Sequence, residues 1–300
     1  MDNSMSTFIL SPGSLAPLIH VILFHHVLAA SSIDLAKAEA AAKQDSAEAQ
    51  FFELGRTYLK GDNTEKDYAR AFELLSKAAE KGHAGAEDLL ASMYESGLGV
   101  TQDYAKAVFW YGKAADAGIP SSQYNLGGLI IQGKGCAPDP AQAVAWYEKA
   151  AAQGMPEAMA ALGRVYYFGD YGIRQNYPEA AKWLSQAAAK GNAWAQNTLG
   201  VMNEIGLGVN RNITTAVAFF RKAAEQGDAK AQSNLGRMYA RGKGVERNLA
   251  LAYQWLKLSM EQNEITAQKV LDEIQPEMSP EQIAEGERLA RDFRNRTRQR

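Results

Sequence analysis

The sequence predicts an all-α solenoid of about six helix-turn-helix repeats. Two columns of residues recur about every 36 residues between Ala47 and Glu264. The first column is a Leu followed by a small residue, at Leu54-Gly55, Leu90-Ala91, Leu126-Gly127, Leu162-Gly163, Leu199-Gly200 and Leu235-Gly236. The second column is an Ala-Ala pair with a Gly three residues after it, and the pairs begin at Ala78, Ala114, Ala150, Ala187 and Ala223. Self-similarity at a fixed period of this length is typical of a solenoid.

Each repeat is predicted to contain two helices, as the second repeat illustrates. Its first half carries a stripe at helical spacing, formed by Ala86, Leu90, Met93, Tyr94 and Gly97. Its second half carries a second stripe, formed by Ala107, Trp110, Tyr111, Ala114, Ala115 and Gly118. The glycines between the stripes can adopt the left-handed conformation that ends a helix, so they predict the turn. One pair of helices buries too little apolar surface to be stable alone, so the repeats must stack.

The lettering of the second repeat resembles the Sel1-like repeat family, a class related to tetratricopeptide repeats. The matching positions are Ala84, Leu90, Tyr94, Gly97-Leu98-Gly99-Val100, Asp103, Lys106-Ala107, Trp110, Lys113-Ala114-Ala115 and Gly118. Six copies cover residues 47–264, more than two thirds of the chain. The resemblance implies a right-handed α-α superhelix that serves as a scaffold or adaptor for other proteins. It carries no catalytic residues with it.

Residues 1–30 are interpreted as a hydrophobic leader. The run from Leu15 to Ala30 has no charged residue and is long enough for a secretory signal, but short for a membrane span. However, no Lys or Arg precedes Lys37, whereas a signal peptide usually begins with a basic segment. We therefore expect an exported protein, periplasmic or secreted, if the leader is real. The alternative is a cytoplasmic protein, and contact with a membrane is expected only through this segment if it is not cleaved.

The rest of the chain divides without linkers. Residues 31–46 are predicted to form an N-terminal capping helix, and residues 47–264 form the six repeats. Residues 265–293 are predicted to form two closing helices, the second opened by Ser279 and Pro280. Residues 294–300 are expected to be a solvated basic tail. The turn at Gly169–Ile173 has one extra residue, and such an insertion is either neutral or functional.

No catalytic, metal or cofactor site is predicted. His83 is the only histidine outside the first 30 residues, so a catalytic triad or a zinc site based on histidines is excluded there. Cys136 is the only cysteine and is interpreted as a packed thiol. The stretch from Gly128 to Gly135 resembles a P-loop, but Gly135 replaces the Ser or Thr that binds the metal. A net charge of -2 gives no reason to expect nucleic acid as a partner.

A candidate binding face follows from the register of the repeats. In each first helix, the positions -5, -2, +2 and +5 from the repeated Leu point away from the core stripe. In tetratricopeptide-like stacks this face lines the concave side. The candidate partner-binding residues at these positions are Tyr124, Ile131, Arg164, Tyr167, Trp194, Asn197 and Arg237. Aromatic residues and Arg are enriched in interface hot spots, so we expect repeats three to five to bind an extended or helical peptide with acidic character. The alternative is that neighbouring repeats bury some of these side chains.

Two classes of function are compatible with the sequence. The first is a non-catalytic scaffold or adaptor that binds a protein or peptide on the concave face. The alternative is an exported enzyme or cell-envelope factor, because some cysteine-rich relatives in the same family have been associated with binding or hydrolysing β-lactams. Those relatives have disulfide-stapled repeats, and a single cysteine cannot form them. The β-lactam activity is therefore not carried over to this chain.

Overall fold

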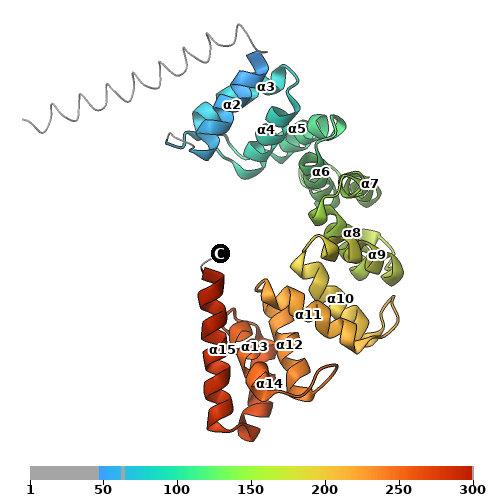
Figure 1. Cartoon of the computed structure of the whole chain (residues 1–300). Helices are drawn as coiled ribbons and strands as arrows, with labels where there is room; N and C mark the ends of the chain where they lie inside the picture. The colour runs from blue at the N-terminus through green and yellow to red at the C-terminus, as the bar shows by residue number, and fades with distance from the viewer. Residues whose placement is uncertain (1–46, 62–64, 299–300) are drawn as a thin grey trace, which may run out of the picture. The chain divides into compact units, whose positions relative to one another are not determined.

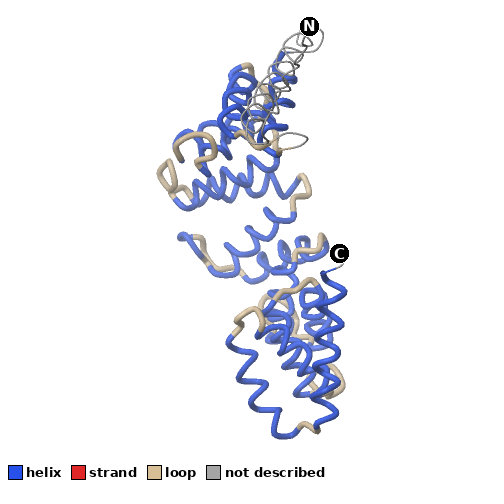
Figure 2. Tube along the Cα trace, turned by 90° about the vertical axis from the view of Figure 1, so that its left-hand side faces the viewer, coloured by secondary structure: helices blue, strands red, loops and turns tan. Residues whose placement is uncertain are grey.

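The computed structural model describes residues 47–61 and 65–298, and these residues form helices and no β-strands (Figure 2). The predicted all-α solenoid is confirmed. The predicted leader (residues 1–30) and N-terminal capping helix (residues 31–46) lie outside the described residues. In chain order (Figure 1), the helices are α2 (Ala47–Lys60), α3 (Tyr68–Glu80), α4 (Ala84–Ser96), α5 (Tyr104–Asp116), α6 (Pro120–Gln132), α7 (Pro140–Ala152), α8 (Pro156–Phe168), η1 (Asp170–Gly172), α9 (Tyr177–Ala189), α10 (Ala193–Ile205), α11 (Ile213–Glu225), α12 (Ala229–Arg241), α13 (Leu249–Met260), α14 (Ile265–Ile274), η2 (Gln275–Glu277) and α15 (Pro280–Arg298).

The chain divides into two compact units, the first ending at Lys113 and the second beginning at Ala114. In the first unit, α2 packs on α3, and α3 packs on α4. In the second unit, the two helices of each repeat pack as the pairs α6 and α7, α8 and α9, α10 and α11, and α12 and α13. Consecutive repeats contact each other through α7 and α8, α9 and α10, and α11 and α12. The helices therefore stack in chain order within each unit.

The small residue after the repeated Leu allows the two helices of a repeat to approach closely. A Cβ atom added at Gly200 in α10 would lie 2.5 Å from the ring of Phe220 in α11. A Cβ atom at Gly163 in α8 would lie 2.5 Å from Cδ2 of Leu184 in α9. Both partner side chains are completely buried. The glycine column is thus required by packing between the helices of one repeat.

A ladder of buried glutamines joins three of the repeats to their neighbours. Gln196 in α10 donates from Nε2 to the carbonyl oxygen of Ala188 at the end of the preceding repeat, 3.1 Å away. Its Oε1 accepts a hydrogen bond of 2.7 Å from Gln226, at the end of α11. The same arrangement recurs at Gln123 with Gln153 and at Gln232 with Gln262. Each buried amide therefore satisfies groups on two helices at once, which is a role that the apolar stripes do not reveal.

The C-terminal end is closed by α14 and α15, which pack against α13. Trp255 and Phe293 make an edge-to-face contact with ring centroids 5.3 Å apart. Residues 294–300 are expected to form a tail after the last helix, but α15 continues to Arg298. Arg294 forms an ion pair with Glu261 in the turn after α13, and Arg288 pairs with Glu285 and Asp292. The pair with Glu261 thus joins the first residue of the basic segment to the end of the sixth repeat.

Candidate protein-binding site

All seven candidate residues lie on α6, α8, α10 and α12, within the second compact unit. We call the surface formed by the -5, -2, +2 and +5 positions of these helices the first-helix face. Arg164 is exposed on it, and four candidates are partly buried, namely Tyr124, Tyr167, Trp194 and Arg237. Ile131 and Asn197 are only 4% and 7% exposed. These two residues therefore cannot offer much surface to a partner.

The expectation that Ile131 and Asn197 are free of the core is wrong. The equivalent of Ile131 in the second repeat is Glu95, whose carboxylate contacts Tyr111 on the second helix of the same repeat. In the second repeat the +5 side chain thus reaches the second helix of its own repeat, and the same direction accounts for the burial of Ile131. Asn197 is covered for another reason, because its Oδ1 accepts a hydrogen bond of 3.0 Å from Asn234 in the next repeat.

Arg237 is not a free cation either. Its guanidinium donates two hydrogen bonds of 2.8 Å to the carboxylate of Glu204 and one of 3.2 Å to Asn234. Lys243 donates a further hydrogen bond of 2.8 Å to Glu204. The hydrogen bond from Arg237 is the main cause that lowers the pKa of Glu204 to about 2, although burial opposes this shift. Arg237 thus joins the fifth repeat to the sixth and has little capacity left for a ligand.

Glu204 was missed by the sequence analysis, although the repeat register contains a signal for it. It occupies the +5 position of the fifth repeat, the position of Glu95 and Ile131 in earlier repeats. An acidic residue at +5 followed by Arg at +2 in the next repeat predicts an ion pair between the repeats.

Arg164 contrasts with Arg237, because the described residues contain no ion pair or hydrogen bond partner for its side chain. Arg164 acts electrostatically on Tyr147 in α7. Tyr124 and Tyr147 have ring centroids 5.7 Å apart. Burial raises the pKa of Tyr147 well above its usual range, Tyr124 and Tyr171 raise it further, and Arg164 lowers it. Tyr124, Arg164 and Tyr171 therefore each act on Tyr147, and we call these four residues the Tyr–Arg cluster.

Two members of the Tyr–Arg cluster were not predicted. Tyr147 belongs to the second helix of its repeat, so the first-helix register could not select it. Tyr171 lies in η1, within the turn that has the extra residue, and is 46% exposed. Its φ of 58° is unusual for a residue other than glycine, and such backbone conformations are concentrated at functional sites. The irregular turn supplies one ring of the cluster.

Apolar side chains continue the first-helix face beyond the cluster. Tyr167 packs edge-to-face on Phe168 and Tyr177, with ring centroids 4.9 and 5.7 Å apart. Phe168 and Ile205 are the last residues of α8 and α10, six residues after the repeated Leu, and are 52% and 57% exposed. Exposed apolar side chains at equivalent positions of consecutive repeats are typical of a surface that contacts another protein.

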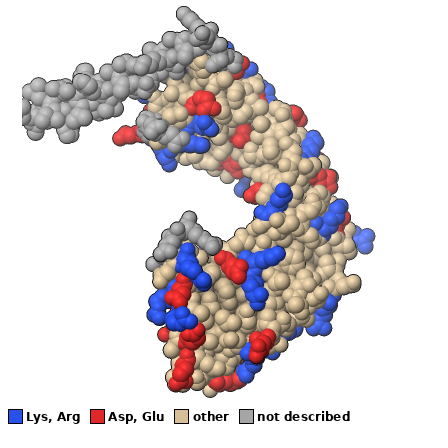
Figure 3. All heavy atoms as spheres, in the orientation of Figure 1, with Lys and Arg blue, Asp and Glu red and all other residues tan. Residues whose placement is uncertain are grey.

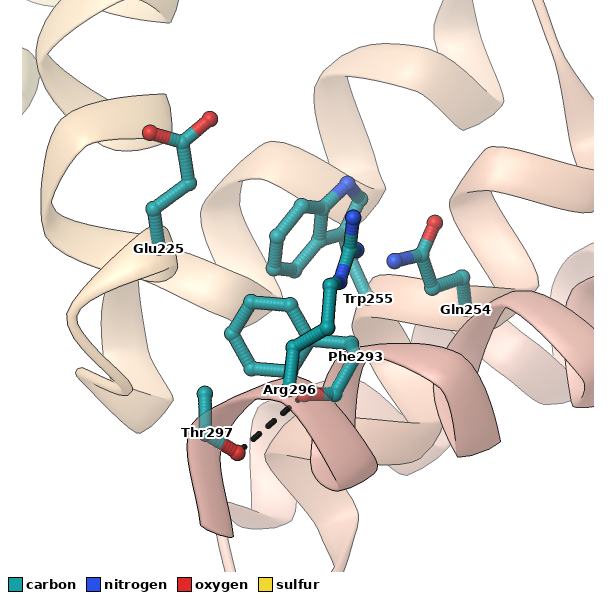
Figure 4. A pocket seen from close by; sticks show the side chains of 6 residues that line it. All are labelled: Glu225, Gln254, Trp255, Phe293, Arg296 and Thr297. Atoms are coloured by element: carbon teal, nitrogen blue, oxygen red, sulfur yellow. Dashed lines mark hydrogen bonds between the residues drawn. The ribbon is translucent and has the colours of Figure 1, made fainter. Parts of the chain in front are cut away.

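A separate cavity of about 240 Å³ lies near the C-terminus (Figure 4). Figure 4 shows the Trp255 and Phe293 rings side by side, with Thr297 donating to the carbonyl oxygen of Phe293 at 3.2 Å. The other lining residues are Glu225, Gln254 and Arg296. This volume is below the roughly 300–1,000 Å³ of most small-molecule sites. A larger open depression of about 570 Å³ follows the irregular turn, from Tyr166 to Pro178.

Few other groups in the described part of the chain suggest chemistry. No three His, Cys, Asp or Glu side chains come together there as metal ligands. His83 caps the start of α4, since its Nδ1 accepts from the backbone N–H of Ala86 at 3.2 Å. Cys136 is half-buried, and burial raises the pKa of its thiol.

On the surface shown in Figure 3, basic and acidic side chains are interspersed. None of the helices in residues 47–61 and 65–298 combines the length and apolar composition needed to cross a membrane.

Comparison with known proteins divides the chain into six repeats that follow the helix pairs of the structure, although the fifth match begins two residues after the start of α10. A family model described as Sel1 repeat matches residues 47–83, 84–119, 120–155, 156–192, 195–228 and 229–264. A protective antigen of uropathogenic Escherichia coli that displays an SLR fold is 36% identical, with a TM-score of 0.76 over 86% of this chain. The match spans 56% of that antigen. A Sel1 repeat protein from Oxalobacter formigenes is 32% identical, with a TM-score of 0.67, over 80% of this chain and 96% of the other. No curated protein matches the chain.

Proposed function

Because the chain belongs to the Sel1 repeat family, we propose that it is a non-catalytic scaffold that binds a partner protein or peptide. Repeats of this family typically serve as protein-interaction scaffolds. The proposed binding surface is the first-helix face of α6, α8 and α10, in the third to fifth repeats. Such a surface would bind a partner through its aromatic side chains and the charge of Arg164, without any catalytic group.

The observation that carries this proposal is that the charge of Arg164 is not neutralised by any described residue. Its exposed guanidinium has no ion-pair or hydrogen-bond partner among the described residues, and it acts on Tyr147, which is buried against the partly buried Tyr124. Arg and Tyr are the residues that most often dominate the binding energy of protein interfaces. The rings are fixed by packing, so they lose little conformational freedom when a partner binds. A partner with acidic character complements the charge of Arg164.

The exposed apolar residues favour a partner that spans more than one repeat. Phe168 and Ile205 lie at equivalent positions of the fourth and fifth repeats, and Trp194 lies at the start of α10. An extended segment or a helix that contacts Arg164 could therefore cover apolar surface on the next repeat as well. We propose that the bound segment presents both acidic and apolar residues to this face, either in alternation along an extended segment or on one side of a helix.

The proposal is tested with a double variant, Trp194→Ala with Arg164→Glu. Immobilised wild-type protein is exposed to cell extract, and each captured protein is then purified and its affinity measured for both forms. We expect the double variant to weaken binding at least tenfold, because it removes an aromatic contact and reverses the charge. Lys190→Glu is the matched control, since Lys190 is an exposed cation at the end of α9, on a second helix. The proposal is abandoned if the double variant binds every captured partner as well as Lys190→Glu does.

Export of the protein remains part of the proposal. It rests on the apolar, uncharged run from Leu15 to Ala30, which lies outside the described residues. Mass spectrometry of the mature N-terminus tests it. A chain that begins near Ala30 supports export, and an intact Met1 on all molecules contradicts a cleaved leader.

A further inference from the structure

Two tyrosines at the same position of consecutive repeats differ in their hydrogen bonding. Tyr111 in α5 and Tyr147 in α7 are 36 residues apart, and their side chains are 1% and 6% exposed. The hydroxyl of Tyr111 donates a hydrogen bond of 2.9 Å to Oε2 of Glu95. The hydroxyl of Tyr147 has no hydrogen-bond partner among the described residues. A buried phenol normally finds such a partner, so its absence at Tyr147 requires an explanation.

The difference arises from three substitutions on the first helix. The residues that act on Tyr111 are Asp88, Ser92 and Glu95. Their equivalents next to Tyr147, each 36 residues later, are Tyr124, Gly128 and Ile131. The third repeat therefore lacks the carboxylate that accepts the hydrogen bond in the second repeat, and Ile131 cannot replace it.

The hydroxyl of Tyr147 is nevertheless accessible. Gly128 has no side chain, and a Cβ atom added there would lie 3.7 Å from the hydroxyl oxygen. In the described residues, the only fully buried side-chain polar atoms without a partner are Gln50 Oε1 and Trp183 Nε1. The Tyr147 oxygen is not one of them. A largely buried donor thus reaches the first-helix face at the point where Gly128 leaves room.

The charge next to this donor has the sign that attracts a carboxylate. The ring of Tyr124 lies 5.7 Å from the ring of Tyr147, centroid to centroid. Arg164 and Tyr171 act electrostatically on Tyr147. Other arginines at the same repeat position are already neutralised, Arg56 by Glu53 and Arg237 by Glu204. Arg164 lacks such an acid in the described part of the chain. The third repeat therefore supplies a hydrogen-bond donor, Tyr147, and the fourth supplies a cation, Arg164, but no described carboxylate binds them.

We propose that the Tyr–Arg cluster binds an Asp or Glu side chain of the partner protein, which occupies the place that Glu95 occupies beside Tyr111. Tyr147 donates a hydrogen bond to the carboxylate, and Arg164 supplies the opposite charge. Tyr124 and Tyr171 flank the carboxylate and limit its contact with water, which strengthens both interactions. This inference rests on the proposed function and adds to it the chemical group that is recognised.

The test uses two displayed peptide libraries. Each library presents nine-residue segments inside a carrier protein, so that no free C-terminal carboxylate is present. The central residue is Glu in one library and Gln in the other, and the remaining positions are randomised among uncharged residues. We expect the wild-type protein to enrich binders from the Glu library and at least tenfold fewer from the Gln library. Glu→Gln in an enriched peptide is expected to weaken its affinity at least tenfold.

Variants of the protein identify the site. Ile131→Glu introduces a carboxylate at the position of Glu95 in the second repeat. We expect this carboxylate to bind Tyr147 and Arg164 in place of the peptide and to lower the affinity for the enriched peptides at least tenfold. Ile131→Gln is its uncharged control and is expected to weaken them less. Tyr147→Phe removes only the hydroxyl and is expected to weaken binding about three- to tenfold. Tyr111→Phe is the matched control and is expected to leave binding unchanged. Circular dichroism and thermal unfolding establish that each variant is folded.

The possible results separate the two proposals. Equal enrichment from both libraries, or enriched peptides that bind Tyr147→Phe and Ile131→Glu as well as wild type, overturns the carboxylate site but leaves peptide binding intact. Failure of both libraries to yield any binder counts against peptide binding on this face and against the carboxylate site together. If Ile131→Glu does not fold, Tyr147→Phe and Arg164→Gln decide the result.

Discussion

At the scale of single residues, two arginines at the same repeat position differ in their partners. Arg237 and Arg164 both lie two residues after the repeated Leu, on α12 and α8. Arg237 forms a two-pronged ion pair with Glu204 of the preceding repeat, whereas Arg164 has no acidic partner among the described residues. The residue at +5 of the preceding repeat decides the outcome, since it is Glu204 in one case and Ile131 in the other. Arg237 is thus held in an ion pair, and Arg164 is the residue of the same column that we propose for recognition.

We expect Glu204→Gln to destabilise the protein by roughly 2–3 kcal/mol. The change leaves Arg237 and Lys243 beside an uncharged amide, and breaking a fully buried ion pair costs about 3–5 kcal/mol. The cost is smaller here because the Arg237 and Lys243 side chains are 24% and 37% exposed. Urea or thermal unfolding measures it. Glu273→Gln is the control, since its ion pair with Arg241 is exposed and should contribute less than about 1 kcal/mol. Equal stability of the two variants would contradict the assigned role of Glu204.

The contribution of Glu204 is also expected to depend on pH. Its pKa is lowered from 4.5 to about 2 in the folded protein, mainly by the hydrogen bond from Arg237. A lowered pKa means that the stabilisation is fully present above the unfolded value and is lost as the pH falls through the folded value. The difference in Tm between wild type and Glu204→Gln should therefore be constant above about pH 5 and shrink toward zero near pH 2. A difference that stays constant down to pH 2 would show that the charge of Glu204 is not responsible.

At the scale of helices, two kinds of contact determine how one helix packs on the next. Within a repeat, glycine brings the first helix against a large side chain of the second, as with Gly200 and Phe220. Between repeats, Gln123, Gln196 and Gln232 join the end of one repeat to the next. The fourth repeat has Met159 at the glutamine position, so this joint is apolar there. That difference occurs in the repeat that also has the irregular turn.

Gly200→Ala is expected to lower stability by about 1–2 kcal/mol. The new methyl would lie 2.5 Å from the completely buried Phe220 ring, and overpacking of this kind typically costs about 1–3 kcal/mol. The higher helix propensity of alanine offsets part of the cost. Gly112→Ala in α5 is the control, because a Cβ atom there meets nothing within 4 Å. It should stabilise the protein by roughly 0.5–1 kcal/mol. Thermal unfolding of both variants checks the opposite signs, and two equal shifts would reject the packing explanation.

At the scale of the whole molecule, a stack of repeats needs ends that differ from its middle. The sixth repeat has no seventh repeat to cover it, and α14 and α15 supply the covering surface instead. Trp255 is only 7% exposed because Phe293 and its neighbours on α15 cover it. A terminal element with an apolar inner side and a charged outer side is what a solenoid requires for solubility. The arginines of α15 provide part of that charged side.

Phe293→Ala is expected to destabilise the protein by about 1.5–3 kcal/mol. Truncation of a buried Phe costs about 3–5 kcal/mol, and Phe293 is only partly buried. Its edge-to-face contact with Trp255 adds to the loss. Thermal unfolding measures the change, with Thr297→Ala as a control on the exposed part of the same helix, expected within about 0.5 kcal/mol of wild type. If both variants have the same unfolding temperature as wild type, α15 does not stabilise the sixth repeat.

The candidate site was only partly accessible to prediction. Tyr124, Arg164, Tyr167 and Trp194 could be selected because the register of the first helices identifies which positions avoid the core stripe. The sequence left open that neighbouring repeats bury some of the candidates, but it could not identify Ile131 and Asn197 as the buried ones, since their burial depends on the second helix and on the next repeat. Tyr147 belongs to a second helix and Tyr171 to a turn, so a search restricted to the first helices excluded both.

The sequence by itself determined the repeat, its period, its two helices and the glycines that separate them, because these properties depend on interactions between residues close in the chain. Only the tertiary structure decided which arginine is neutralised, that Tyr147 has no hydrogen-bond partner among the described residues although Tyr111 has one, and that α15 continues through most of the basic segment. Those outcomes depend on pairs about 16 to 37 residues apart, such as Tyr111 with Glu95 and Asn234 with Asn197. The distance between such side chains is fixed by the stacking of helices, and local patterns contain no measure of it.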